Sequence, residues 1–109
     1  MQVITIHGNL VADAQLRTRK DANNSSQSEF ISFKVACNSV AGEVKETTYY
    51  DVTYRKTGIF EYLKKGQPVV VSGLLRATAS VKENGQAYIN MNIYNTSIVE
   101  LAGKRQLND

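Results

Sequence analysis

The sequence predicts an all-β fold: a small closed barrel of five strands, with one short helix between the third strand and the fourth. Several segments alternate apolar and polar residues, which is the pattern of a half-buried strand. Residues 47–76 place a strand pattern, a short helical stripe and another strand pattern in direct succession. Asn84 and Gly85 separate two further strand patterns, and an Asn-Gly pair indicates a tight hairpin turn.

The first two predicted strands span residues 2–10 and 30–37. Alternation assigns the core-facing side of the first strand to Ile4, Ile6, Gly8 and Leu10. It assigns the core-facing side of the second to Ile31, Phe33, Val35 and Cys37. Lys34 points the other way. Residues 12–28 and 39–46 are richer in polar and turn-forming residues, so we expect loops there.

The third strand, the helix and the fourth strand form the central unit of the prediction. Residues 47–55 are rich in Thr, Tyr and Val, which suit a pleated surface. A short helix is expected over residues 59–65, because three apolar residues there have helical spacing: Ile59, Tyr62 and Leu63. Gly66 is placed to stop this helix. The fourth strand covers residues 68–82 and begins with Pro68, where the missing N–H is tolerated.

The fifth strand covers residues 88–94, and residues 95–101 close the domain. Its core-facing residues by alternation are Ile89, Met91 and Ile93. We therefore expect one domain over residues 1–102, followed by a short polar tail over residues 103–109. Five strands with one closing helix are typical of the OB-fold, a Greek-key barrel that binds oligomers across one face. The pattern alone also fits other small barrels.

Composition excludes several classes of protein. With 109 residues and a hydrophobic fraction of 42%, the chain can build one modest core. No apolar run approaches the length of a membrane-spanning helix, and the N-terminal residues lack the pattern of a secretory signal. The single cysteine, Cys37, cannot form an internal disulfide, which fits a reducing cytoplasm. The net charge of +3 permits a nucleic-acid partner without requiring one.

Enzymatic chemistry has little support in the sequence, and we expect no catalysis, no metal and no other cofactor. The chain holds one histidine, His7, and one cysteine, Cys37, so a cluster of His and Cys ligands is not available. Nothing marks an orienting third residue that would make these two a nucleophilic pair. No glycine-rich phosphate loop occurs either.

Five segments of the sequence together resemble those of a known protein family. Their order and spacing carry the resemblance, and no single segment is specific alone. They are Ile6-His-Gly-Asn-Leu10 followed by Arg17, Phe33-Lys-Val-Ala-Cys37, Thr48-Tyr-Tyr-Asp-Val52, Glu61-Tyr-Leu-Lys-Lys-Gly66 and Val69-Val-Val-Ser-Gly-Leu-Leu-Arg76. In these segments the chain is similar to the bacterial single-stranded DNA-binding proteins, over roughly residues 2–101. The resemblance implies a non-catalytic, cytoplasmic protein associated with the nucleoid. It also implies a homotetramer on which a single strand wraps, with a dimer as the alternative.

The chain departs from that family pattern in three respects. The family typically uses tryptophans as stacking platforms, and this chain has none. The matching positions hold Val40, Tyr49 and Ser80, so Tyr49 alone keeps an aromatic ring. Arg55 replaces an aromatic residue that often follows on the same strand. The family usually continues into a linker and an acidic C-terminal tip, whereas this sequence ends at Asp109, so we expect the short form without the tip.

Single strands are bound through cationic groups and through aromatic faces on which bases stack. Alternation points Tyr49, Arg55 and Arg76 outward from their strands. Other cations lie in or beside the loops that would rim the barrel. The candidate DNA-binding residues are Arg17, Arg19, Lys20, Lys34, Lys45, Tyr49, Arg55, Lys56, Arg76, Lys82 and Tyr88. Asp51 lies on the same face, and its negative charge argues against DNA binding there unless it pairs with a neighbouring Arg.

We therefore expect a binder of single-stranded DNA with little sequence preference, acting in replication, recombination or repair through electrostatic capture and base stacking. Replication or repair proteins are further expected partners, and no membrane is. The missing tryptophans and acidic tip leave another role open: an OB-fold assembly factor of replication or the primosome, working mainly through protein–protein contacts. Packing or a subunit interface is expected for Tyr50, Tyr54, Phe60 and Tyr62.

Overall fold

The computed structural model describes residues 2–20, 27–41 and 44–102, apart from the side chains of residues 20, 27, 39–41, 44 and 45. The described elements are β1 (Val3–Leu10), β2 (Gln15–Lys20), β3 (Gln27–Ala41), β4 (Val44–Tyr54), the 3₁₀ turn η1 (Phe60–Tyr62), β5 (Pro68–Val81) and β6 (Ala87–Leu101). The tail predicted over residues 103–109 lies outside the described residues.

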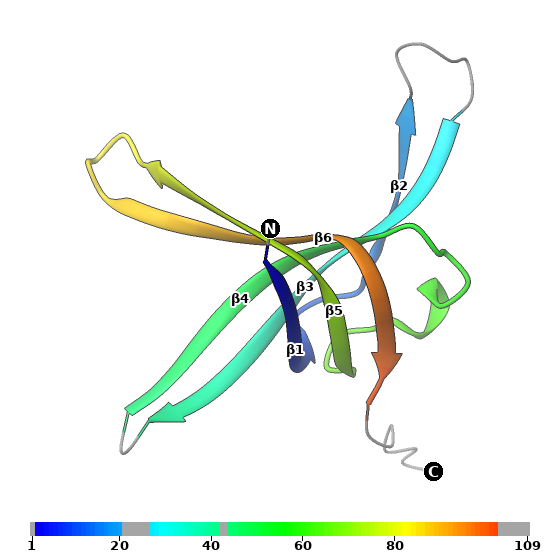
Figure 1. The fold of residues 1–109 in the computed structure, drawn as a ribbon, viewed down its shortest axis with the longest axis horizontal. Coiled ribbons are helices and arrows are strands. Elements are labelled where there is room, and N and C mark those ends of the chain that lie inside the picture. Colours follow the sequence, from blue (N-terminus) through cyan, green and yellow to red (C-terminus); the bar gives the residue numbers. More distant parts are fainter. Residues whose placement is uncertain (1, 21–26, 42–43, 103–109) are drawn as a thin grey trace.

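Five of the six described strands close into a ring in the order β1-β5-β6-β4-β3 (Figure 1). The ring is closed where Asn9 and Leu10 of β1 pair with β3. Strands β4 and β6 run parallel where Val52 lies beside Ile93, and the other pairs are antiparallel. The ring strands are the five predicted ones, so the all-β, five-stranded barrel of the OB-fold is confirmed.

The core lies inside this ring. Its buried apolar residues are Ile6, Leu10, Ala14, Ile31, Phe33, Val35, Val52, Tyr54, Leu63, Val69, Val71 and Ile93. Full burial of a large apolar side chain contributes about 1.5–3 kcal/mol, so this cluster is the main source of stability. Gly8 lets β1 approach β3 at the closure, because a Cβ at this position would lie 2.7 Å from Val35 Cγ1.

A short helix lies at the predicted place between the third and fourth ring strands, but it is the single 3₁₀ turn η1 rather than a helix over residues 59–65. Its N–H groups bond three residues back, as between Leu63 N and Phe60 O at 3.2 Å. The N–H of Lys65 donates instead to Asp13 Oδ1 at 2.8 Å, so this donor is not available to continue an α-helix. No described segment forms a helix long and apolar enough to cross a bilayer.

Three two-stranded arms extend from the barrel: β2–β3, β3–β4 and β5–β6 (Figure 1). Strand β2 lies within the loop predicted over residues 12–28. It pairs only with β3, and its apolar residue Leu16 is 46% exposed. Because β2 has no buried face, its sequence lacks the apolar alternation by which a half-buried strand is predicted. Ile89 was predicted to face the core but is 67% exposed, because the β5–β6 arm runs past the end of the barrel. The Asn-Gly turn is confirmed, with Gly85 at a φ of 85°.

Candidate nucleic-acid interface

The outward side chains of β3 and β4 form a polar outer face on the barrel. Residues directly opposite each other in this antiparallel pair share a face. The opposed pairs on the outer face are Ser32 with Thr53, Lys34 with Asp51, and Ala36 with Tyr49. Their neighbours Phe33 and Val52 point into the core. The strict alternation of the two strands therefore fixes which side chains a ligand on this face can reach.

The same face continues onto the other half of the barrel. Asp51 of β4 lies beside Asn92 of β6 in the parallel pair, and Asn92 lies opposite Arg76 of β5. Next along the arm, Thr78 lies opposite Asn90. Polar side chains thus extend without interruption from β3 to β5, with Asp51 near the middle.

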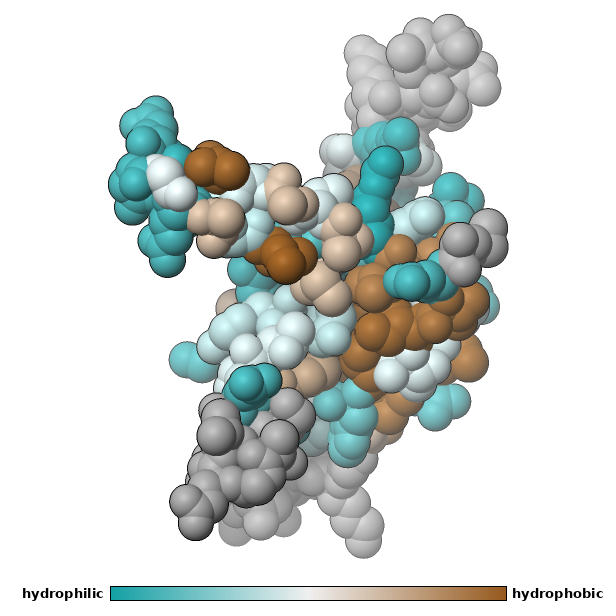
Figure 2. All heavy atoms as spheres, turned by 60° about the vertical axis from the view of Figure 1, so that its left-hand side comes forward, coloured by the Kyte–Doolittle hydropathy of each residue, from teal (hydrophilic) through white to brown (hydrophobic). Residues whose placement is uncertain are grey.

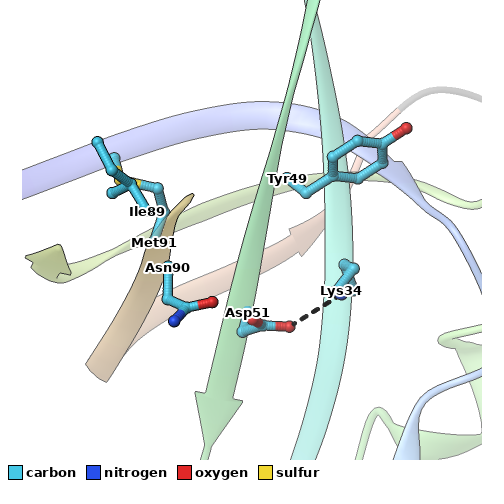
Figure 3. A pocket seen from close by; sticks show the side chains of 6 residues that line it. All are labelled: Lys34, Tyr49, Asp51, Ile89, Asn90 and Met91. Carbon is cyan, nitrogen blue, oxygen red and sulfur yellow. Dashed lines mark ion pairs between the residues drawn. The ribbon is translucent and has the colours of Figure 1, made fainter. Parts of the chain in front are cut away.

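Two depressions on this face join into one groove, which we call the outer groove. The first measures about 300 Å³ and lies between the β3–β4 surface and the β5–β6 arm (Figure 3). It is lined by Lys34, Tyr49, Asp51, Ile89, Asn90 and Met91. The second measures about 420 Å³, and its lining includes Arg17, Phe30, Ser32 and Thr53 on the side of β2. Lys34 and Asp51 line both depressions, so the two adjoin at this pair.

Arg17 is held over the second depression by its neighbours. Its Nε donates to Ser32 Oγ at 2.7 Å, and its Nη2 donates to Gln15 Oε1 at 2.6 Å. These bonds fix a planar guanidinium that can pair with phosphate or stack on a base. Directly opposite Arg17 lies Phe30, which is half-buried and was not among the predicted binding residues. The sequence could have indicated Phe30, because a residue next to core-facing Ile31 points outward by alternation and this one is aromatic.

Lys34 and Asp51 form an ion pair in the middle of the groove, with Lys34 Nζ 3.8 Å from Asp51 Oδ1. Their side chains are 50% and 51% exposed, so water screens the pair and it contributes at most about 1 kcal/mol. A neighbouring Arg was expected to pair with Asp51 if this face binds DNA, but the partner of Asp51 is Lys34. A weak, exposed pair of this kind can open for a charged or polar ligand.

Tyr49 supplies an accessible aromatic ring to the groove, since it is 54% exposed and lines the first depression. Tyr54 of the same strand is buried and Tyr50 is half-buried against the core, as expected for packing residues. Tyr62 is 49% exposed on η1 and lines neither depression. Of the tyrosines on β4, Tyr49 is therefore the one that presents its ring to the groove.

The other candidates lie outside the two depressions. Arg76 is exposed on the polar side of the β5–β6 arm, and Lys82 Nζ lies 5.5 Å from the centre of the Tyr88 ring on the same arm. Exposed positions on β2 or just after β4 are held by Arg19, Arg55 and Lys56. The predicted side chains that lie outside the described part of the structure are those of Lys20 and Lys45.

The titratable groups outside the groove are not arranged for catalysis or metal binding. Desolvation by burial raises the pKa of the Cys37 thiol above its ordinary value of 9.0, which disfavours the nucleophilic thiolate. Among the described residues, no group of three or more His, Cys, Asp or Glu side chains is placed to hold a metal ion. The outer groove is a polar surface with accessible aromatic rings, and its charged lining residues are two cations, Arg17 and Lys34, and two carboxylates, Asp13 and Asp51.

Comparisons with known proteins identify the family and support the fold. The profile of the Single-strand binding protein family matches residues 1–101. A comparison with curated protein sequences finds no match. The crystal structure of a small single-stranded DNA-binding protein from Streptomyces coelicolor is similar with a TM-score of 0.67 and 24% identity, covering 93% of this chain and 94% of that chain. A Plasmodium falciparum SSB in complex with ssDNA gives a TM-score of 0.68 and 18% identity, covering 94% and 96%. At these identities, the likeness to the two structures supports the fold.

Proposed function

Because the chain belongs to the Single-strand binding protein family, we propose that it binds single-stranded DNA along the outer groove, with little sequence preference. The observation that carries the proposal is that Arg17, Lys34 and Tyr49 line two adjoining depressions on one face of a family member. The proposed role is binding without catalysis, in replication, recombination or repair. The single Cys37 fits a reducing cytoplasm, and a location at the nucleoid would follow from the proposed DNA binding.

The proposed mechanism has two steps. Cations on and beside the groove first attract the phosphates, and the counterions that they displace make this step dependent on salt. Bases then stack on the exposed ring of Tyr49, and we add Phe30 as a second platform at the far end of the groove. Arg17 is already fixed beside Phe30, so little side-chain entropy is lost when it meets the strand. The remaining predicted cations would contact the strand beyond the groove.

Fluorescence anisotropy with labelled oligo-dT, compared with a duplex of equal length, tests the proposal. We expect preference for the single strand and a linear fall of log affinity with log salt. Two phosphate contacts, by Arg17 and Arg76 alone, would give a slope of about −1.4. Equal affinity for single and double strands at low salt would refute the proposed function. Repeating the titration with oligomers of increasing length measures the site size.

We also propose that the protein assembles as a homotetramer, with a dimer as the alternative. Support comes from the outer face of β1, β5 and β6, where Val3 is 72% exposed and Ile98 is 45% exposed. Figure 2 shows hydrophobic surface gathered on one side of the molecule. Exposed apolar area of this kind is typical of protein–protein contact sites. Light scattering on the intact protein and on Ile98→Glu distinguishes tetramer, dimer and monomer.

The assembly-factor role is the second candidate, and the exposed apolar residues at Val3 and Ile98 also suit a different protein as partner. Under that role the chain would dock replication or repair proteins and bind oligo-dT weakly. A pull-down with purified helicase and primase components, set against the anisotropy titration, separates the two roles. Tight oligo-dT binding without a protein partner would exclude the assembly-factor role.

A further inference from the structure

The acidic side chain of Asp51 lies where the two depressions of the outer groove meet, whereas Asp13 lines the second depression alone and accepts from the Lys65 N–H. We propose that Asp51 reads the base lying over it and selects bases that carry an exocyclic amino group over thymine. This inference rests on the proposed function, since it concerns the strand bound in the same groove. It assigns base selection to a residue that the binding mechanism above does not use.

The carboxylate of Asp51 is available to a ligand. Its side chain is 51% exposed, and the distance of 3.8 Å to Lys34 Nζ exceeds hydrogen-bonding length. Figure 3 shows the Asn90 amide oxygen directed toward Asp51 from the β5–β6 arm, with Lys34 on the neighbouring strand at its other side. The Nδ2 of Asn90 donates to Ser80 Oγ at 3.5 Å, so the ammonium of Lys34 is the hydrogen-bond donor beside the carboxylate.

Charge decides which part of a strand lies over this point. A phosphate placed on Asp51 would meet a like charge, whereas Arg17 and Arg76 lie to either side of Asp51 on β2 and β5. Phosphates are therefore favoured toward the rims of the groove and bases toward its centre. The stacking surface of Tyr49, which lines the same depression, also favours a base there.

The base edges differ in what they offer to a carboxylate. Cytosine presents an N4 amino group that donates to Asp51, while its N3 and O2 can accept from Lys34. Adenine and guanine also carry amino donors. Thymine presents O4 at the place of that amino group, so in the same pose two acceptors would face each other, and its one donor, N3–H, is displaced from the position that N4 occupies in cytosine. In Asp51→Asn, the new amide can donate to O4, and the discrimination should be lost.

The test compares oligo-dC with oligo-dT of equal length by anisotropy, at low salt and slightly alkaline pH where cytosine is uncharged. The proteins are the full chain, Asp51→Asn, and Glu61→Gln as the matched control. Glu61 is exposed on η1 and lines neither depression, so its variant loses the same charge elsewhere. We expect the ratio of dC to dT affinity to fall about fivefold or more in Asp51→Asn and to stay unchanged in Glu61→Gln.

Three other results of this titration would each overturn the inference. If the two variants raise both affinities alike and leave the ratio unchanged, Asp51 acts only through net charge and the inference is overturned. If Asp51→Asn binds as the full chain does, the carboxylate does not touch the strand and the inference is overturned as well. If the full chain binds neither oligomer, the proposed function itself fails, and the inference fails with it.

Discussion

Truncating Tyr49 to alanine tests the base-stacking step of the proposed mechanism. A base stacked on one aromatic side chain is worth about 1–3 kcal/mol, so Tyr49→Ala should weaken oligo-dT binding roughly 5- to 150-fold. Because the side chain is 54% exposed, its removal should cost only about 1 kcal/mol of unfolding free energy, and the domain should stay folded. Tyr62→Ala is the matched control, since Tyr62 is 49% exposed outside the groove.

The salt dependence of the same variants separates stacking from phosphate contact. Tyr49→Ala should lower the affinity at every salt concentration and leave the slope of log affinity against log salt unchanged. Arg76→Ala should reduce that slope by about 0.7, the value for one phosphate of a single strand. Lys64→Ala, an exposed cation at the end of η1, should leave the slope as it is.

Combining Tyr49→Ala with Arg76→Ala gives the decisive result for the position of the groove. If both residues contact the strand at separate points, their free-energy losses should add, and thermal unfolding should still show a folded domain. Unchanged oligo-dT affinity in a folded double variant would refute the reasoning, because the strand would then lie on a different face of the barrel.

Two further predictions concern the barrel. Gly8→Ala places a Cβ within 2.7 Å of Val35 Cγ1 at the ring closure and should cost about 1–3 kcal/mol in urea unfolding, whereas Gly58→Ala, with open space around it, should cost far less; equal losses would show that β1 yields easily. For Cys37, the raised pKa in the folded state means that stability is complete below the ordinary value of 9.0 and falls as the pH rises from there through the raised value. Cys37→Ala should flatten that part of the urea-unfolding profile, and an unchanged difference between the two proteins across this range would contradict the assignment.

The sequence predicted the closed ring because each ring strand has one buried side. Period-two alternation appears where one face packs on the core, and Ile6, Val35 and Val52 all follow it. The arms lack that constraint. Strand β2 pairs with β3 along one edge and has little apolar pattern, so the same rule gives a loop for it. Ile89 shows the opposite error. The regular alternation of its strand predicts a core position, but nothing in the described barrel covers its side chain.

The residues of the candidate site could be predicted from the sequence only where alternation within a ring strand determines which way they point. Lys34 and Tyr49 were predicted on the outer face because their strand neighbours point into the core, and the structure brings them to one groove. Arg17 could be placed only near a loop, because its position depends on the register of β2 against β3. Phe30 and Asn90 were missed for a similar reason. Their access to the groove follows from how the arms leave the barrel, which alternation within a strand does not determine.

The small number of aromatic platforms bears on how a long strand would be held. Stacking on Tyr49 and Phe30 together supplies roughly 2–6 kcal/mol, much less than tight binding needs. In the proposed homotetramer, one strand could occupy several grooves in turn, and each further contact would be intramolecular. Affinity should therefore rise steeply with oligomer length in the assembled protein. In an Ile98→Glu variant that scatters light as a monomer, long and short oligomers should bind almost alike, whereas a persistent length dependence there would place the extra affinity within a single chain.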